Sequence, residues 1–310
     1  MSLKTTVLIL ISITVSTITS KYCNPSYLRD GMHFFSIKEN FMYYPWHTYV
    51  PPEGQVKFMM VRGEQNIPQI CKDATKYNTL QEIIFYKINL QYMEPGLFNS
   101  KHLEHVFIQY NQLKNIPLGL FNGTSIRSLV LSDNQIGYID DGAFKDMTKL
   151  EAIALDFNKL KSFNPEWFVG ASVFYELSFI HNELRDLPAQ TTKYMAESFD
   201  KPEFKVFGSI NFDNNGIQFI HQDAFSNLRY FGAISLSNNK ILELPDKVFS
   251  RFEFLLTLYM NTNSFICFTN RTVNSFHGIK RLFLGDNHIN GDCVQRIKKY
   301  FDWKNDLVYF

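Results

Sequence analysis

The sequence has little net charge, few cysteines and none of the short motifs that mark common enzymes. Its 31 lysines and arginines nearly balance 30 aspartates and glutamates, so the formal net charge is +1. That balance gives no electrostatic support for nucleic acid or an anionic membrane surface as a partner. The eight histidines form no H-E-x-x-H pattern, and C-x-x-C, G-x-S-x-G and phosphate-loop motifs are absent. The sequence therefore predicts a protein that is not an enzyme, with no metal site and no cofactor.

Long apolar runs are missing everywhere except at the N-terminus. There, Lys4 precedes an uncharged run over residues 5–19 that ends in small residues. This pattern predicts a secretory signal peptide over residues 1–20, because the run is too short and too rich in serine and threonine for a spanning helix. A membrane anchor is the alternative. The C-terminal tetrapeptide is too short for a lipid-anchor signal, so we expect a secreted, extracellular protein with no transmembrane anchor.

What the sequence does have is one pattern, repeated along most of its length. Residues 126–149 read IRSLVLSDNQIGYIDDGAFKDMTK, with apolar residues at the first, fourth, sixth and eleventh positions. Asparagine follows at the ninth position, Asn134, and phenylalanine at the nineteenth, Phe144. One such unit cannot bury its own apolar face, so neighbouring units must stack to make a stable core.

The same pattern recurs in about ten units over residues 56–290. They begin at Val56, Leu80, Leu103, Ile126, Leu150, Phe174, Phe207, Phe231, Leu255 and Ile279. Asparagine fills the ninth position at Asn111, Asn134, Asn158, Asn182, Asn215, Asn239, Asn263 and Asn287. A buried amide there can bond the backbone of adjacent turns, so these asparagines are predicted to be structural. The recurring phenylalanines, Phe98, Phe121, Phe144, Phe168, Phe225 and Phe249, are predicted to stack in a column.

The chain resembles extracellular leucine-rich repeat proteins of the 24-residue type over residues 56–290. The resemblance implies an α/β-type repeat solenoid, a horseshoe with a concave parallel β-sheet and convex loops or short helical turns. In layout it is most similar to secreted insect members of the innate immune system, which act in recognition or as scaffolds. It departs from them by reaching Phe310 without a coiled-coil tail or extra dimer-forming cysteines. It also lacks the four-cysteine N-terminal cap of Toll-type ectodomains.

The segments on either side of the repeats are expected to close the core. Residues 21–55 are rich in aromatics and do not repeat, which is typical of an N-terminal cap, although ligand binding by these aromatics is an alternative. Residues 291–310 are expected to form a C-terminal cap helix, with Val294, Ile297, Tyr300 and Phe301 on one face. A membrane-surface helix would need more length and more basic charge.

The four cysteines can be paired by distance. Parallel strands lie about 4.8 Å apart, so about eight repeats place Cys71 more than roughly 35 Å from Cys267. A disulfide needs Cα atoms within about 7 Å. The predicted pairs are therefore Cys23–Cys71 and Cys267–Cys293, against the alternatives of a free cysteine or an interchain bridge.

A binding surface is predicted from outward positions of the concave strands, which are expected to be mainly polar. In the first repeats they are apolar instead, and we predict one partner-binding patch from them, edged by Gln81, Lys87, Glu104 and Asp133. Its members are Ile84, Tyr86, Phe107, Tyr110, Val130 and Phe157. Such a patch usually marks a protein or ligand site. The alternative is that the N-terminal cap or a loop covers it.

Three smaller features remain. The repeat from Phe174 has 33 residues, and its excess lies in residues 186–204, where residues 191–199 could form a short helix; it is either functional or a tolerated insertion. Asn122 and Asn270 begin glycosylation sequons on expected convex or loop positions. Asp133, Asp156 and Asp213 suggest a calcium or acid site, but solvated polar columns are far commoner.

Together these features predict a secreted, non-enzymatic recognition or scaffold protein, and the resemblance implies a role in innate immunity. Its partner would be an extracellular protein or a microbial surface component. The alternatives are an adhesion protein of the matrix or cell surface, or a non-catalytic subunit that stabilises a secreted enzyme. The oligomeric state does not follow from the sequence.

Overall fold

The structure is a computed structural model, and it describes residues 7–11, 32–36, 56–62, 67–70, 79–171, 175–195 and 208–310. Within residues 7–11 and 32–36 only the backbone is described. Cys23, Cys71, most of the predicted N-terminal cap and residues 196–204 of the long repeat lie outside the described residues. The chain divides into two compact units. The first is residues 1–153 with 167–171, and the second is residues 154–166 with 172–310.

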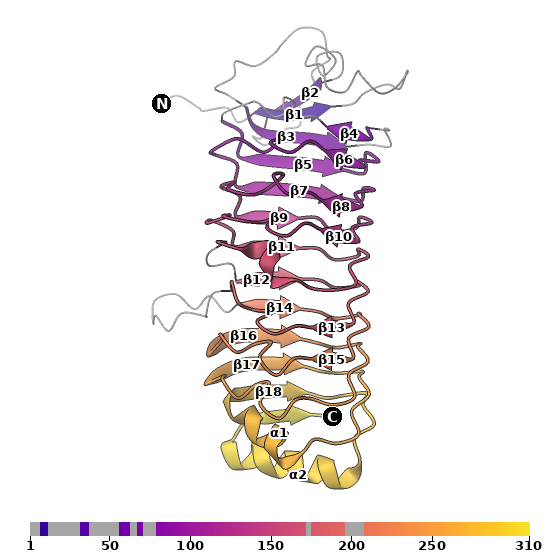
Figure 1. Cartoon of the computed structure of the whole chain (residues 1–310), viewed down its shortest axis with the longest axis vertical. Helices are drawn as coiled ribbons and strands as arrows, with labels where there is room; N and C mark the ends of the chain where they lie inside the picture. The colour runs from indigo at the N-terminus through magenta and orange to yellow at the C-terminus, as the bar shows by residue number, and fades with distance from the viewer. Residues whose placement is uncertain are drawn as a thin grey trace. The chain divides into compact units, whose positions relative to one another are not determined.

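The first unit is a stack of parallel strands with one antiparallel strand at its end (Figure 1). The strands of its main sheet are β2 (Met32–Ser36), β1 (Val7–Ile11), β3 (Val56–Arg62), β5 (Glu82–Tyr86), β7 (His105–Gln109) and β9 (Ser128–Val130), in that order. Only β1 and β2 pair antiparallel. Two-residue strands form small parallel pairs, β4 (Gln69–Ile70) with β6 (Tyr92–Met93) and β8 (Asn115–Ile116) with β10 (Tyr138–Ile139).

The second unit repeats this arrangement and ends in helices (Figure 1). Its main sheet contains β12 (Glu176–Ser178), β14 (Ser209–Asn211), β16 (Tyr230–Ser235), β17 (Phe254–Tyr259), β18 (Ile279–Phe283) and β19 (Leu307–Tyr309), all parallel. Two short strands, β13 (Asp186–Leu187) and β15 (Phe219–Ile220), form a separate parallel pair. The helices are α1 (Asn270–Ser275), η5 (Phe276–Gly278) and α2 (Gly291–Lys304). The boundary between the two units falls within β11 (Ala152–Ala154) and within η4 (Pro165–Phe168).

The strands form because apolar residues alternate along them, and one face of each sheet fills the core. In β5, for example, Ile83 and Phe85 are buried while Ile84 and Tyr86 are not. Among the residues that begin repeats and whose side chains the structure describes, all are buried, including Leu103 and Ile126 in the first unit and Leu255 in the second. The predicted repeat solenoid is therefore confirmed in each unit. We call the opposite face, which bears the non-core side chains of these strands, the open face.

The asparagine prediction is also confirmed. Asn134 is buried, and its Nδ2 donates to the carbonyl of Ile108 at 2.7 Å, in the preceding repeat. Its Oδ1 accepts from the backbone N–H of Leu113 at 3.2 Å. In the second unit Asn239 bonds the carbonyl of Phe212 and the N–H of Ile217 in the same way. Each amide thus satisfies backbone groups where the chain leaves the strand, and ties neighbouring repeats together.

The predicted phenylalanine column is buried and its rings stack. In the first unit, centroids lie 5.0 Å apart for Phe98–Phe121, 6.1 Å for Phe121–Phe144 and 5.2 Å for Phe144–Phe168. In the second unit, Phe225 and Phe249 lie 5.7 Å apart. The sequence missed the continuation of this second column, Phe276, which is 6.1 Å from Phe249 and belongs to a 3-10 turn rather than a repeat position.

One expectation for the rest of the chain differs from the structure over the residues that it describes. In the segment predicted as a short helix over residues 191–199, residues 191–194 form turns and Met195 forms a bridge, because side-chain and backbone bonds from Thr192 to Ala224 and Asn227 hold them against the next repeat. Residues 196–199 lie outside the described residues. β1 lies inside the segment predicted as a signal peptide, and cleavage near Ser20 stays a prediction.

The C-terminal region contains the expected helix and an unexpected strand. The Asn290 side chain caps α2 by accepting from the N–H of Cys293, and Asn305, with φ of 56°, ends it in the left-handed conformation. Cys293, Ile297 and Phe301 are its buried residues, whereas Val294 and Tyr300 are half-buried. The helix ends at Lys304, and β19 then pairs with β18, so this end of the second unit is covered by both elements.

Candidate functional site: the open face of the first unit

The predicted patch residues on β5, β7 and β9 lie in one row. In the strand register Ile84 is beside Phe107, and Phe107 is beside Val130. Their side chains share the open face, because alternate residues of a strand point to the same side. All three are half-buried, which is the exposure of side chains that pack against neighbours but keep one side in solvent. The structure therefore brings these three predicted residues together.

Two tyrosines extend this row at the ends of the strands. Tyr86 ends β5 and is 39% exposed, and Tyr110 follows β7 and is 49% exposed. Their rings meet edge to face with centroids 5.1 Å apart. Within the described residues this part of the face is open to solvent. We call the set Ile84, Tyr86, Phe107, Tyr110 and Val130 the apolar patch.

The apolar surface continues onto β3, which the sequence analysis did not include. Met60 lies beside Ile84 in the register, and both pack against Phe58, whose side chain is 8% exposed. Met60 occupies the same outward repeat position as Ile84, so the repeat spacing alone is the signal that places it in this row.

The patch has an ionisable edge that differs from the predicted one. Glu82 and His105 are paired in the register and lie on the same strand faces as Ile84 and Phe107. Burial raises the pKa of Glu82, and the nearby His105 partly offsets this rise. Gln81 and Glu104, which were predicted to edge the patch, each lie one residue before the strand begins.

Tyr110 holds its position against a conformational cost. Its φ is 55°, in the left-handed region that costs a non-glycine residue about 1–2 kcal/mol. The residue before the asparagine at the ninth repeat position adopts this conformation in other repeats too. In several of them it is aspartate or asparagine, as at Asp133, Asn214 and Asn238. Those residues tolerate the conformation better than an aromatic does. The same φ occurs at Lys87, His181 and Thr262, so it belongs to the repeat backbone and does not by itself mark a binding site.

The sixth predicted patch residue, Phe157, belongs to the second unit. It is 50% exposed, with φ of 53°, and its ring stacks on His181 with centroids 4.5 Å apart. The structure gives it a local partner on its own unit, and we describe it separately from the apolar patch.

The open face of the second unit has a different character. Asp156 accepts from Ser178 Oγ at 2.6 Å and from the N–H of Ile180 at 2.8 Å. Asp213 repeats this, with Ser235 Oγ at 2.6 Å and the N–H of Ser237 at 2.7 Å. Burial raises the pKa of both carboxyls, and these hydrogen bonds partly counteract it. Their oxygens are thus used to join adjacent repeats, which is a structural explanation for the aspartates suspected of binding calcium.

An aromatic row on the last strands of the second unit was missed by the sequence analysis. Tyr259 on β17 stacks on Phe283 of β18 at 4.8 Å, and Phe283 stacks on Tyr309 of β19 at 4.4 Å. Tyr259 and Phe283 occupy the same outward repeat position as Phe107, but Tyr309 lies beyond the repeats. No repeat spacing could have placed it there.

The second predicted cysteine pair is present: Cys267 and Cys293 form a disulfide with Cα atoms 5.6 Å apart. Asn122 is exposed in a turn, and Asn270 is exposed at the first residue of α1, a helix rather than the expected loop. In the described ranges, no three His, Cys, Asp or Glu side chains gather as a possible metal site. Among the described residues, no helix has the length and apolar character needed to cross a bilayer.

Comparison with known families agrees with this architecture. A leucine rich repeat model matches residues 124–184, and a BspA type leucine rich repeat region of six copies matches residues 167–290. The chain belongs to the leucine-rich repeat family. No curated protein matches it in sequence.

Solved leucine-rich repeat structures are similar in fold. The APL1 leucine-rich repeat domain is 17% identical with a TM-score of 0.56, over 80% of this chain and 59% of that one. A TLR13–ssRNA13 complex is 17% identical with a TM-score of 0.56, over 75% of this chain and 33% of that one. A Drosophila Toll–Spatzle complex, described as a hub in development and innate immunity, is 18% identical with a TM-score of 0.51, over 83% of this chain and 40% of that one. The chain thus spans less than two thirds of each of these structures, and the likeness establishes the fold.

Proposed function

We propose that this chain is a secreted, non-enzymatic recognition protein that binds an extracellular protein through the apolar patch of the first unit. The observation that carries the proposal is the exposed pair Tyr86 and Tyr110 beside Ile84, Phe107 and Val130. Exposed aromatics on a rigid apolar surface are typical of the residues that dominate protein–protein binding.

Innate immune recognition or scaffolding is the setting we propose. The support is the fold shared with APL1 and with Toll in its complex with Spatzle. The similar TLR13 structure contains ssRNA instead. Arg62 lies beside Tyr86 in the register and Lys87 follows Tyr86, but the patch itself consists of aliphatic and aromatic side chains with Glu82 at its edge, a composition typical of a protein-binding surface. A protein partner is therefore favoured for this surface.

The test is affinity capture from the extracellular fluid of the source, using the whole secreted chain as bait. We expect one protein to be captured by the wild type and lost with Phe107→Glu/Tyr110→Glu, with the melting temperature almost unchanged. Tyr138→Glu is the matched control, because Tyr138 on β10 is 63% exposed in the same unit but lies outside the main sheet. Equal capture by all three proteins, or unfolding of the double variant, would reject the patch as the binding site.

The same experiment separates the alternative roles. A secreted enzyme captured in stoichiometric amounts would indicate a stabilising subunit, and a matrix or cell-surface component would indicate adhesion. N-terminal sequencing of the secreted protein tests the signal peptide, since the mature chain is expected to begin near Lys21.

A further inference from the structure

Helices α1 and α2 of the second unit enclose a cleft that no part of the proposed function uses. Its volume is about 470 Å³, and Asn270 and Val273 of α1 and Arg296, Tyr300 and Trp303 of α2 are among its lining residues. Trp303 is 81% exposed, the largest exposure of any large hydrophobic side chain in the described residues. The cleft therefore combines an aromatic wall with the first residue of a glycosylation sequon.

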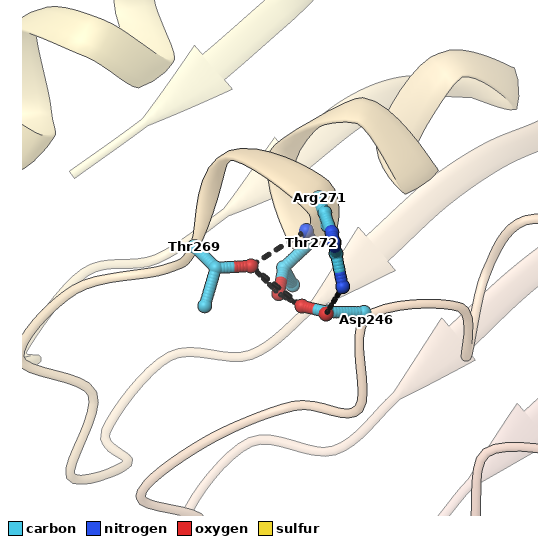
Figure 2. Close-up of polar contacts among 4 residues, drawn as sticks. All are labelled: Asp246, Thr269, Arg271 and Thr272. Atoms are coloured by element: carbon cyan, nitrogen blue, oxygen red, sulfur yellow. Dashed lines mark hydrogen bonds and ion pairs between the residues drawn. The ribbon is translucent and has the colours of Figure 1, made fainter.

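The sequon itself is built into the start of α1 (Figure 2). Thr269 caps the helix, with its Oγ1 accepting from the N–H of Thr272 at 3.0 Å. The hydroxyls of Thr269 and Thr272 donate to Asp246 at 2.5 and 3.1 Å, and Arg271 lies 3.9 Å from the same carboxylate. The hydroxyl bonds, with that from Thr269 foremost, lower the pKa of Asp246, so its carboxylate is ionised at neutral pH.

This network leaves the two ends of the sequon in opposite situations. Thr272 is 1% exposed with its hydroxyl already bonded, whereas Asn270 is exposed and is one of the residues that line the cleft. The sequon is recognised through both asparagine and threonine. Because Thr272 is inaccessible once α1 has formed, any enzyme that uses this sequon must act on the chain before it folds.

The other sequon differs in this respect. Asn122 is exposed in a turn, and Thr124 is only half-buried, with its hydroxyl bonded to the nearby carbonyl of Phe121 at 2.7 Å. That site stays accessible in the folded protein. The two sequons are therefore an internal comparison for when modification takes place.

We propose that Asn270 is N-glycosylated before α1 folds, and that the first N-acetylglucosamine of the glycan rests in the cleft against Tyr300 and Trp303. In the reaction, the amide nitrogen of Asn270 displaces the diphosphate of a lipid-linked oligosaccharide at the anomeric carbon. The amide loses one proton, and the diphosphate leaves with the electrons of the broken bond. This inference rests on the proposed secretion, since only a chain in the secretory pathway meets that donor.

The cleft suits a sugar residue on chemical grounds. The C–H groups of one sugar face carry small positive charge and favour the negative face of an aromatic ring, which Trp303 presents to solvent. The hydroxyl and acetamide groups of the sugar can bond the polar lining, which includes Asn274 and Arg296. Since the glycan is tethered at Asn270, its effective concentration at the cleft is high, so a weak contact is enough to hold it there.

The first experiment maps occupancy by mass spectrometry of glycopeptides from the full chain secreted by eukaryotic cells. We expect sugar on Asn270, and none when the chain is refolded unmodified and then incubated with microsomes, whereas Asn122 is modified in both cases. A secreted chain with sugar on Asn122 and not on Asn270 overturns this inference and leaves the proposed secretion standing. A chain that is retained in the cell without sugar at either site rejects both.

The second experiment tests where the sugar lies. Trp303 fluorescence, isolated as the difference from Trp303→Phe, is compared in the secreted protein and in Asn270→Gln, which keeps Thr272 and its bonds to Asp246. We expect the glycosylated protein to show emission at shorter wavelength and lower acrylamide quenching, because the sugar covers the indole. Trp167 is only 4% exposed and serves as an internal reference. Identical quenching of Trp303 in the two proteins would show that the glycan projects into solvent and would overturn the placement.

Discussion

In the first unit the outward positions of β5, β7 and β9 hold Ile84, Phe107 and Val130, whereas β12, β14 and β16 of the second unit hold Ser178, Asn211 and Ser235. Both sets occupy the same place in the repeat. In the second unit the serines donate to Asp156 and Asp213 and so join neighbouring repeats. In the first unit the corresponding side chains make an exposed apolar surface.

This difference shows which positions the fold requires and which it leaves free. The inward leucines, the asparagines at the ninth repeat position and the phenylalanine column are alike in both units, because each repeat needs them to stack. Outward positions are under no such requirement. Where they carry hydrogen bonds between repeats, stability explains them. Where they form an exposed apolar row, as Ile84, Phe107 and Val130 do, we propose binding as the explanation.

The largest effect is expected where the second unit closes its core. Lys304 Nζ lies 2.7 Å from Asp306, both side chains are nearly buried at 10% and 8% exposure, and the ammonium also donates to the carbonyls of Phe276 and Ile279. Burial lowers the pKa of Lys304. Asp306→Asn leaves this ammonium without its carboxylate, so we expect a loss of about 3–5 kcal/mol in the free energy of unfolding.

Urea denaturation measures this loss, and hydrogen exchange of α2 amides locates it in the second unit. The double change Lys304→Met/Asp306→Leu should recover much of the stability, because it removes both charges rather than one. An Asp306→Asn protein as stable as the wild type would show that the pair is solvated and that the end of the second unit is closed in another way.

A smaller loss of unfolding free energy should distinguish the open face of the second unit from that of the first. Asp213→Ala removes the acceptor of the Ser235 hydroxyl and the Ser237 N–H, which predicts a cost of about 1–3 kcal/mol. Tyr86→Ser in the first unit removes a side chain that is 39% exposed, and such surface changes usually stay within about 0.5 kcal/mol. Equal losses in the two variants, measured by urea denaturation, would contradict the contrast between a structural face and a binding face.

Much of this architecture could be predicted from the sequence, because the repeat pattern fixes both the strand and the side to which each residue points. Asn134, Phe144 and the inward apolar residues were placed correctly for that reason. The row of Ile84, Phe107 and Val130 also followed, since equal positions in successive repeats become neighbours in a parallel sheet.

What the sequence could not supply lies outside the repeat spacing. Tyr309 reaches the aromatic row through β19, and Phe276 joins the phenylalanine column from a 3-10 turn. The positive φ of Tyr110 was equally hidden, because only the backbone reveals that its position favours asparagine.

A gain of stability is expected from Tyr110→Asn. Asparagine adopts the left-handed conformation more easily, so we expect about 1 kcal/mol more stability together with loss of partner capture. The reverse change in the second unit, Asn238→Tyr, alters the equivalent exposed position, where φ is 56°, and should cost a similar amount. Melting temperatures that move the same way in both variants would refute the interpretation that Tyr110 is retained for binding.

The smallest effect concerns the pH dependence of the second unit. Burial raises the pKa of Asp156 and of Asp213 in the folded state, so between the ordinary carboxyl pKa of about 3.8 and these raised values the native chain binds more protons than the unfolded one. Their contribution to stability is therefore complete below that window and is lost as the pH rises through it. Asp156→Asn/Asp213→Asn keeps oxygen acceptors for the serine hydroxyls and removes this dependence, so melting temperatures measured across the window should vary less than in the wild type.

Ser235→Ala should have the opposite effect, because the hydroxyl bond lowers the pKa of Asp213 and its removal lets burial raise that pKa further. If neither variant changes the slope, these aspartates are more hydrated than their hydrogen bonds indicate, and the polar character of this open face would reflect solvation rather than the joining of repeats.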